Sequence, residues 1–264
     1  MKRKYMIIVL MAGALELTGC SQGTSNSAKN GTTGSENTII SESDIAILDT
    51  EDMFTERDRD TEYDESECTA ISLSDEETKC DSDGVKMDGQ TVTITEGGTY
   101  LLTGSLSNGS VVVDTDKTEK VQLILENVSI INEEGAGICV EQADKVFITL
   151  ADGSTNKIVS NSFTGNEDTN IDGAIFSRED LTLNGSGTLK ITSAAHGIVS
   201  KDDLVLTGGV YQIQSEKQGL SGKESVRIAD GTFTITSGTD AIHSEDTDED
   251  TKGFVYITGG VLTL

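Results

Sequence analysis

Three charged triplets recur at a nearly constant spacing and could act together on a ligand. They are Arg178-Glu179-Asp180, Lys201-Asp202-Asp203 and Lys223-Glu224-Ser225. Their first residues, 23 and then 22 positions apart, would stack as a column of cations if the chain repeats at that period. Stacked like charges repel each other unless counter-charges intervene, so a sugar carboxylate or another charged ligand could bind along Arg178, Lys201 and Lys223. The alternative is that the triplets are solvated turns that prevent sideways association.

A second recurring column precedes the triplets, with one polar side chain in each repeat. Its members are Asp172, His196, Gln218 and Asp240, and the acidic run 245–250 follows the last of them. Calcium takes six to eight oxygen ligands, which closely spaced carboxylates can supply. The predicted calcium ligands are Asp172, Asp202, Asp240, Asp246, Asp248 and Asp250. The alternative is a disordered acidic loop, since no EF-hand spacing is present.

Catalysis has weaker support in the sequence than binding. A polysaccharide lyase needs a basic side chain that removes the proton next to a uronate carboxylate. Lys201 and Lys223 are the candidates, but acidic neighbours keep a lysine protonated at neutral pH. His196 and His243 are not placed beside an evident nucleophile. The chain has no Trp, so flat aromatic platforms for crystalline glycans are also missing. We predict a non-enzymatic protein, with a lyase as the alternative.

The spacing of these charged columns comes from a sequence repeat that occurs four times between residues 172 and 264. Apolar residues alternate with polar ones in each copy, the period-2 pattern of half-buried strands. The aligned apolar columns begin at Ile175, Leu181, Leu183, Leu189 and Ile191. Short strands separated by Gly-rich turns at a period of about 22 residues predict an all-β, single-stranded parallel β-helix. In such a fold, each coil buries the inward apolar side chains of its neighbours. We assign this domain to residues 67–264, with residues 69–106 as irregular capping coils.

The N-terminal residues resemble an export signal followed by a spacer. A basic start and an apolar run end in Leu17-Thr18-Gly19-Cys20, which resembles a bacterial lipobox. We expect residues 1–20 to be a lipoprotein signal peptide and Cys20 to be diacylated, which anchors a protein stably. An ordinary signal peptide with an incidental Cys20 is the alternative. Residues 21–66, Ser/Gly/Thr-rich and then acidic, are predicted to be a disordered tether.

Export also bears on the remaining cysteines, because the compartment would be oxidising. Cys68 and Cys80 flank an eleven-residue segment and are predicted as a disulfide pair, with two reduced thiols as the alternative. Cys139 lies next to an apolar column position and is expected to be a core or turn residue.

The formal net charge of −27 restricts the partners of this chain. Nucleic acid and anionic membrane faces would be repelled, so we expect no nucleic-acid partner and membrane contact only through the lipid anchor. An acidic polysaccharide would be repelled too, unless a divalent cation lies between. We expect a monomer.

The repeat sequences themselves resemble a known family. AIFSREDLTLNGSGTLKI, GIVSKDDLVLTGG and SGKESVRIADGTFTI, together with VFITLADGSTNKI, are similar to bacterial surface proteins described as carbohydrate-binding domain-containing. The resemblance covers about residues 69–264. It implies a right-handed β-helix like that of pectate lyases, calcium binding, and recognition of plant cell-wall or other acidic polysaccharides. With that ligand class, the predicted carbohydrate-binding residues are Arg178, Lys201, Lys223, His196 and Gln218. Family members run on through more coils, so we expect this chain to be truncated at its C-terminus.

Together these features predict a calcium-dependent polysaccharide-binding protein, lipid-anchored on the outer face of a bacterial cell membrane. A polysaccharide lyase and a structural surface stalk or adhesin without a glycan ligand remain the alternatives.

Overall fold

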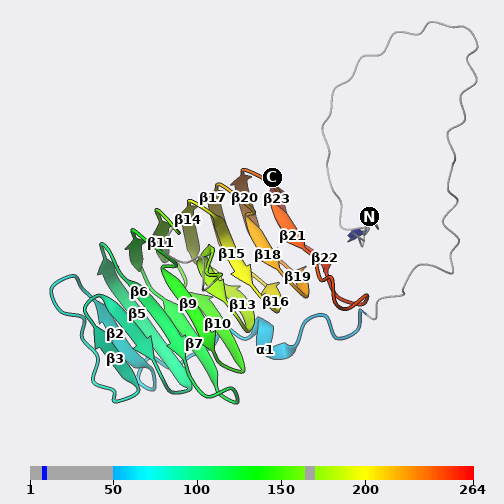
Figure 1. Ribbon diagram of the computed structural model, residues 1–264. Coiled ribbons are helices and arrows are strands. Elements are labelled where there is room, and N and C mark those ends of the chain that lie inside the picture. The colour runs from blue at the N-terminus through cyan, green and yellow to red at the C-terminus, as the bar shows by residue number, and fades with distance from the viewer. Residues whose placement is uncertain (1–7, 11–49, 164–169) are drawn as a thin grey trace, which may run out of the picture.

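The protein is a parallel β-solenoid (Figure 1). Each regular coil has three strands, and each of these strands belongs to a different sheet, A, B or C. The computed structural model describes residues 8–10, 50–163 and 170–264. Sheet A contains β1 (Ile8–Leu10), β2 (Thr69–Leu73), the start of β5 (Gly98–Leu106), β7 (Lys120–Leu125), β10 (Lys145–Leu150), β13 (Asp180–Gly185), β16 (Asp203–Leu206), β19 (Ser225–Ile228) and β22 (Phe254–Ile257). Sheet B contains β3 (Val85–Asp88), β4 (Thr91–Ile94), β6 (Ser110–Asp114), β9 (Ile138–Gln142), β12 (Gly173–Ser177), β15 (His196–Ser200), β18 (Leu220–Gly222) and β21 (Ile242–Ser244). Sheet C contains the end of β5, β8 (Ser129–Asn132), β11 (Thr155–Ser160), β14 (Thr188–Ser193), β17 (Val210–Ser215), β20 (Thr232–Ser237) and β23 (Val261–Thr263).

The strand registers confirm the predicted solenoid and its five apolar columns. One column in sheet A, for example, runs in register through Val121, Val146, Leu181, Leu204, Val226 and Val255. The coils between these residues are 25, 35, 23, 22 and 29 residues long. The predicted period of about 22 residues therefore holds only for the regular block, and the other coils are longer because loops project between their strands.

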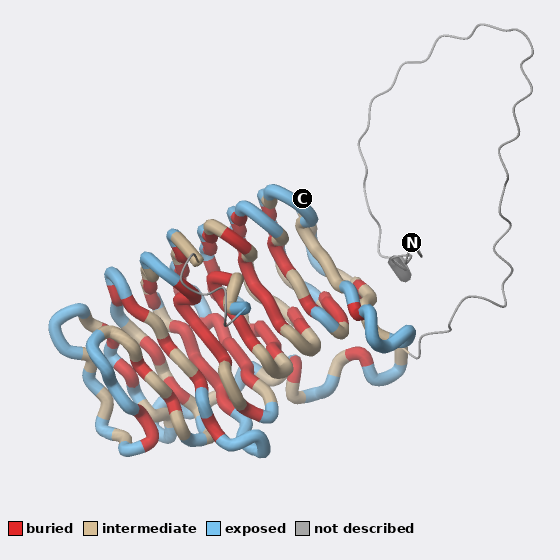
Figure 2. Tube along the Cα trace, viewed as in Figure 1, coloured by how far each residue is buried: buried red, intermediate tan, exposed pale blue. Residues whose placement is uncertain are grey.

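The core is the row of inward side chains that neighbouring coils bury for one another. Figure 2 shows these buried residues as red bands that recur from coil to coil. Sheet C alternates cleanly, since Tyr211 and Ile213 point inward while Gln212 between them is exposed. Tyr211 stacks on Phe233 of the next coil with ring centroids 4.8 Å apart. Stacked coils thus bury what no single coil could.

The N-terminal cap departs from the parallel pattern. β3 and β4 form an antiparallel hairpin, whose turn places Gly89 at a φ of +60°, a conformation that glycine adopts without strain. β2 pairs with β5 and is bridged on its other side at Ser72 by Lys79. These features match the irregular capping segments expected for residues 69–106.

The prediction of a disordered tether is wrong for its last residues. Residues 50–60 form an ordered segment, the strap, which crosses the outer face of sheet A. The strap contains the helix α1 (Glu56–Arg59), which lies beside β13 and β16 (Figure 1). Phe54 packs against Tyr256 of β22, with ring centroids 6.0 Å apart, and the Met53 carbonyl accepts from Arg227 of β19. Further along, Arg57 donates to Gln122 of β7. The strap therefore crosses the sheet from its last coil to one of its first.

A buried carboxylate holds the strap in place. Asp58 is 1% exposed, and its Oδ1 lies 2.8 Å from Lys145 Nζ and accepts from Thr182 Oγ1 at 2.7 Å. Its carbonyl accepts from Thr207 and Asn184. Burial alone would raise the pKa of Asp58, but the hydrogen bonds from Lys145, Thr182 and Thr55 lower it below its usual range. Asp58 is therefore ionised and links α1 to three coils.

Most of the predicted signal peptide, Cys20 and residues 21–49 lie outside the described residues. Within residues 8–10, β1 pairs in parallel with β22 at the C-terminal end of sheet A. In the described part of the chain, no helix combines the length and apolar character that crossing a membrane requires.

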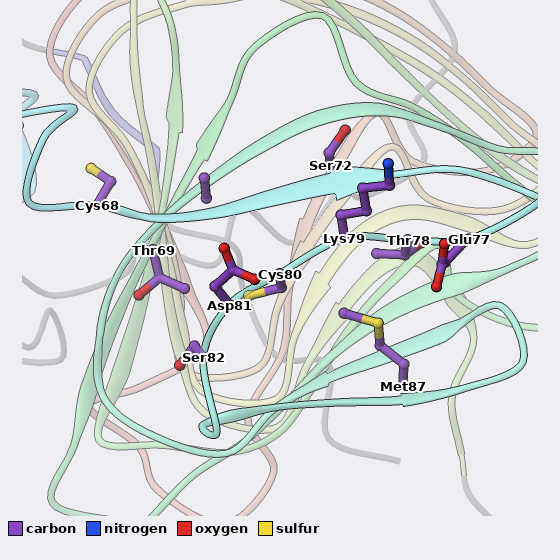
Figure 3. A pocket seen from close by; sticks show the side chains of 11 residues that line it. Cys68, Thr69, Ser72, Glu77, Thr78, Lys79, Cys80, Asp81, Ser82 and Met87 are labelled. Carbon is purple, nitrogen blue, oxygen red and sulfur yellow. The ribbon is translucent and has the colours of Figure 1, made fainter.

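The disulfide predicted between Cys68 and Cys80 is not formed, and both are free thiols, as is the buried Cys139. Figure 3 shows the first two thiols on separate segments around a hollow of about 920 Å³ at the N-terminal end. The bridge between Ser72 and Lys79 sets Cys80 opposite Ile71, three residues beyond Cys68. That offset is about 10 Å along a strand, beyond disulfide reach. Cys80 packs on the core, while Cys68 Sγ donates to the Asp64 carbonyl.

Candidate functional site

The two charged columns that the sequence indicates form the opposite walls of one groove on the outer face of sheet B. The groove has a volume of about 440 Å³ and crosses β15, β18 and β21. One wall carries Asp172, His196 and Gln218, and the other carries Lys201, Lys223 and Glu245. Its floor is the outward column Val199, Ser221 and His243. The strands here are only three to five residues long, so the two walls lie close enough to contact one ligand.

At the N-terminal end of the groove, Asp172 ties the two walls together. One carboxylate oxygen lies 3.4 Å from His196 Nε2, and the other lies 3.4 Å from Lys201 Nζ. The backbone fixes this arrangement, because His196 donates its N–H to the Asp172 carbonyl and Lys201 donates to Ser177 of the preceding coil. The Lys201 side chain is 38% exposed, so its charge remains accessible to a ligand.

His196 is neutral in this setting and has both ring nitrogens engaged. Burial, then the nearby Lys217, Lys201 and His243, lower the pKa of His196 further than Asp172 raises it. Nδ1 accepts the backbone N–H of Gln218 at 3.3 Å, so the proton of the neutral ring sits on Nε2, facing Asp172. This histidine therefore orients the wall and has no free nitrogen to act as a base.

At the C-terminal end of the groove, the floor residue His243 faces two carboxylates. Its Nδ1 lies 3.4 Å from Asp240, and its Nε2 lies 3.9 Å from Glu245. Lys223 lies between the groove and the acidic run, with Nζ 3.3 Å from Asp248 and 3.7 Å from Asp246. The hydrogen bond to Asp248 and the charge of Asp246 raise the pKa of Lys223, so this ammonium stays charged at neutral pH.

Arg178 belongs to the same turn column but does not line the groove. Its Nε lies 2.6 Å from Glu141 of the preceding coil, and its guanidinium lies over the Phe176 ring at 5.5 Å. Phe176 is fully buried in a small outer cluster with Cys139 and Val199. The cation column predicted from the sequence is therefore real, but only its last two members reach the groove.

Asp202, predicted as a metal ligand, lies beside the acidic residues Asp180 and Glu224 instead. Burial, followed by the charges of Asp180 and Glu224, raises the pKa of Asp202 to about 7. Glu224 itself pairs with Lys252. Asp202 does not line the groove.

The predicted calcium ligands Asp172 and Asp240 do not converge on one point with residues 246–250. Asp172 and Asp240 stand three coils apart through successive backbone contacts, which at about 4.8 Å per coil separates them by roughly 14 Å. No three His, Cys, Asp or Glu side chains converge as a metal-binding group in residues 50–163 or 170–264. Asp246 is buried, and its Oδ1 accepts the N–H groups of Asp248 and Glu249, which lower its pKa. The carboxylates of Asp248 and Asp250 remain exposed.

The floor of the groove, including His243, was not assigned to a site from the sequence. Val199, Ser221 and His243 occupy one position in successive repeats, but they share no residue type that would mark them as a column. Glu245 was assigned only to the acidic run, although it continues the column of Lys201 and Lys223. Their equivalence follows from the strand registers.

Comparison with known proteins identifies the family and supports the fold. A family model described as "Carbohydrate-binding domain-containing protein" matches residues 88–264. A protein of that description from Acetivibrio thermocellus is 41% identical over 186 residues, which are 69% of this chain and 65% of that protein. This chain thus spans less than two thirds of that relative. A solved structure of "the polysaccharide lyase-like protein from C. thermocellum, Gadolinium derivative" has a TM-score of 0.69 and 35% identity, and the match covers 73% of this chain and 80% of the other.

Proposed function

This chain belongs to the family of carbohydrate-binding domain-containing proteins, and from that premise we propose that the groove on sheet B binds an acidic polysaccharide without cleaving it. The observation that carries the proposal is the pairing of the two walls across one groove. Lys201 and Lys223 offer exposed ammonium groups on one side, and Gln218 offers an amide on the other. Charged groups that flank hydroxyl-binding groups match a chain of sugars that carry carboxylates.

Cleavage is the weaker alternative, although the solved relative is called polysaccharide lyase-like. A lyase base must be able to accept a proton near neutral pH. Lys223 has its pKa raised by Asp248 and Asp246, and His196 has both ring nitrogens engaged. A lyase would release unsaturated uronate products that absorb in the ultraviolet. We expect none from polygalacturonate, with or without added calcium.

The experiment that tests binding is a calorimetric titration with oligogalacturonate in calcium. The Lys201→Ala/Lys223→Ala variant should bind at least about tenfold more weakly, since it loses two charge contacts, a change of about 1.4 kcal/mol. The matched control is Lys86→Ala/Lys117→Ala, which removes two exposed lysines outside the groove. If both pairs weaken binding equally, net charge and not the groove governs the interaction.

We also propose that calcium strengthens this binding from the exposed side of the acidic run. Asp248 and Asp250 are exposed beside the Lys223 wall, and oxygen-rich acidic loops suit calcium. The solved relative was prepared as a gadolinium derivative, and gadolinium is also a hard cation that prefers oxygen. The Asp248→Asn/Asp250→Asn variant should lose the calcium response of glycan binding, although it carries less negative charge. Tighter binding by this variant in a chelator would instead indicate simple repulsion.

For location, we propose an exported protein anchored through Cys20, as the lipobox-like Leu17-Thr18-Gly19-Cys20 suggests. Cys20→Ala should move the protein from the membrane fraction to the soluble fraction of producing cells. Retention of the variant with membranes would reject the lipid anchor.

A further inference from the structure

The outer face of sheet C is an open and regular surface that differs from the other two faces. The strands β11, β14, β17 and β20 pair in parallel and in register, and each contributes three outward positions. The twelve outward residues are Thr155, Lys157, Val159, Thr188, Lys190, Thr192, Val210, Gln212, Gln214, Thr232, Thr234 and Thr236. None is a carboxylate, although 46 of the 264 residues are Asp or Glu. Acidic residues such as Asp152, Glu216 and Asp230 occur only in the flanking turns.

The two lysines of this surface stack directly on each other, because Lys157 and Lys190 are register partners. Both are exposed, and neither forms an ion pair with another residue of the described ranges. On sheets A and B lysines have carboxylate partners within the protein, as Lys145 has in Asp58 and Lys201 has in Asp172. Two like charges about 4.8 Å apart repel each other unless an anion lies between them.

Amide and hydroxyl groups extend the lysine row along the solenoid axis. Gln212 and Thr234 follow Lys157 and Lys190 in the same register, one per coil. Gln214 and Thr236 form a parallel row beside them, and together these residues line a shallow depression of about 370 Å³. The surface thus offers charge at one end and hydrogen-bonding groups for hydroxyls at the other.

We propose that this sheet C face is a second carbohydrate-binding surface, which holds an acidic oligosaccharide lying along the solenoid axis. A carboxylate of the glycan pairs with Lys157 and Lys190, and its hydroxyl groups hydrogen-bond to Gln212, Gln214 and Thr234. Although the net charge of the chain is negative, this face carries two lysines and no outward carboxylate, so the contact requires no metal. The site is separate from the groove on sheet B, so either can fail without the other.

A glycan fits this surface better than a nucleic acid does. None of the twelve outward residues is aromatic, so bases have nothing to stack on, and none is an arginine that could clamp a phosphate. Duplex DNA carries one charge per about 1.7 Å, which a protein of net charge −27 repels strongly. A polyuronate is less densely charged and rich in hydroxyl groups.

The test is a calorimetric titration of the full chain with oligogalacturonate in excess chelator, which removes the calcium-assisted component of groove binding. Wild-type protein should bind, and Lys157→Ala/Lys190→Ala should bind about tenfold more weakly, equal to about 1.4 kcal/mol. Lys157→Arg/Lys190→Arg should retain binding, since it preserves the charge. Binding should also fall with added salt.

Four results would overturn the proposal. These are no binding of wild-type protein in chelator, equal affinity of the wild-type and double-alanine proteins, a loss that follows Lys201→Ala/Lys223→Ala instead, and preferential binding of a single-stranded oligodeoxynucleotide. Because each surface is tested with its own pair of lysine variants, Lys201/Lys223 for the groove and Lys157/Lys190 for this face, failure of one proposal is distinguishable from failure of the other.

Discussion

The outer faces of sheets A and C are built by the same coils, yet one is sealed and the other is open. In sheet A the outward residues Phe147, Thr182 and Val205 are at most 1% exposed, because the strap lies over them. In sheet C the outward residues Lys190 and Gln212 are exposed. Alternation alone therefore identifies the inward side of a strand, and the types of the outward residues indicate whether something covers them.

The largest loss of stability should come from a carboxylate placed on the covered face of sheet A. The same carboxylate on the open face of sheet C, in the same coil, is the control. Val205→Asp, on β16, should destabilise the protein by about 5 kcal/mol, since it buries an unpaired carboxylate and removes apolar packing. Gln212→Asp, on β17, should change stability by less than about 0.5 kcal/mol. Denaturant unfolding measures both. Similar losses for the two variants would mean that the sheet A face is not covered.

A smaller loss should follow from detaching the strap while leaving the solenoid intact. Asp58→Ala should cost about 3 kcal/mol, because it leaves the largely buried Lys145 ammonium without its partner. The matched control is Asp60→Ala, which removes an exposed carboxylate paired with Arg57 and should cost under about 1 kcal/mol. Chemical denaturation with both variants decides whether the strap contributes to stability, and equal costs would show that it does not.

The smallest effect concerns pH and the Asp202 turn beside the groove. The pKa of Asp202 in the folded protein is about 7, above its unfolded value near 4. A raised pKa contributes stability that is full below about pH 4 and is lost as pH rises through 7. Asp202→Asn should therefore reduce the fall in Tm between pH 5 and pH 8 by about 2–4 °C. If Tm of this variant depends on pH as that of the wild-type protein does, Asp202 is not the titrating group.

Much of the fold was predictable because the inward columns carry a strong signal. Ile213 and Ile235, for example, recur at one spacing with polar residues on either side, and they stack in the structure as expected. The cation column was also predictable, since Lys201 and Lys223 occupy equivalent turns. The period was less general, because loops lengthen the coils outside the regular block.

The strap was missed because its acidic composition resembles a disordered spacer. A local signal was present, since Thr55 and Asp58 form a capping box that begins α1. The outward apolar residues Phe147 and Val205 also required a cover that the repeats themselves do not supply. Because the partners of Asp58 on the solenoid lie 87 or more residues away, no local pattern could identify them.

The groove was only half predictable for a similar reason. Each wall is a repeat column, but the separation of the walls depends on strand lengths and turn geometry that the repeat does not specify. That Asp172 and Asp240 cannot share one calcium ion follows from a distance that the repeat already contained, since the two ends of their column must lie several coils apart.

Lysine acetylation followed by mass spectrometry tests most directly the central claim that the groove on sheet B binds the glycan. It measures the accessibility of lysines inside and outside the groove in one experiment. With oligogalacturonate and calcium present, Lys201 and Lys223 should be acetylated several-fold more slowly than without the glycan. Lys86 and Lys117, which are exposed outside both proposed sites, should react at unchanged rates. Equal rates at Lys201 and Lys223 with and without the glycan would contradict the assignment of this groove as the carbohydrate-binding site.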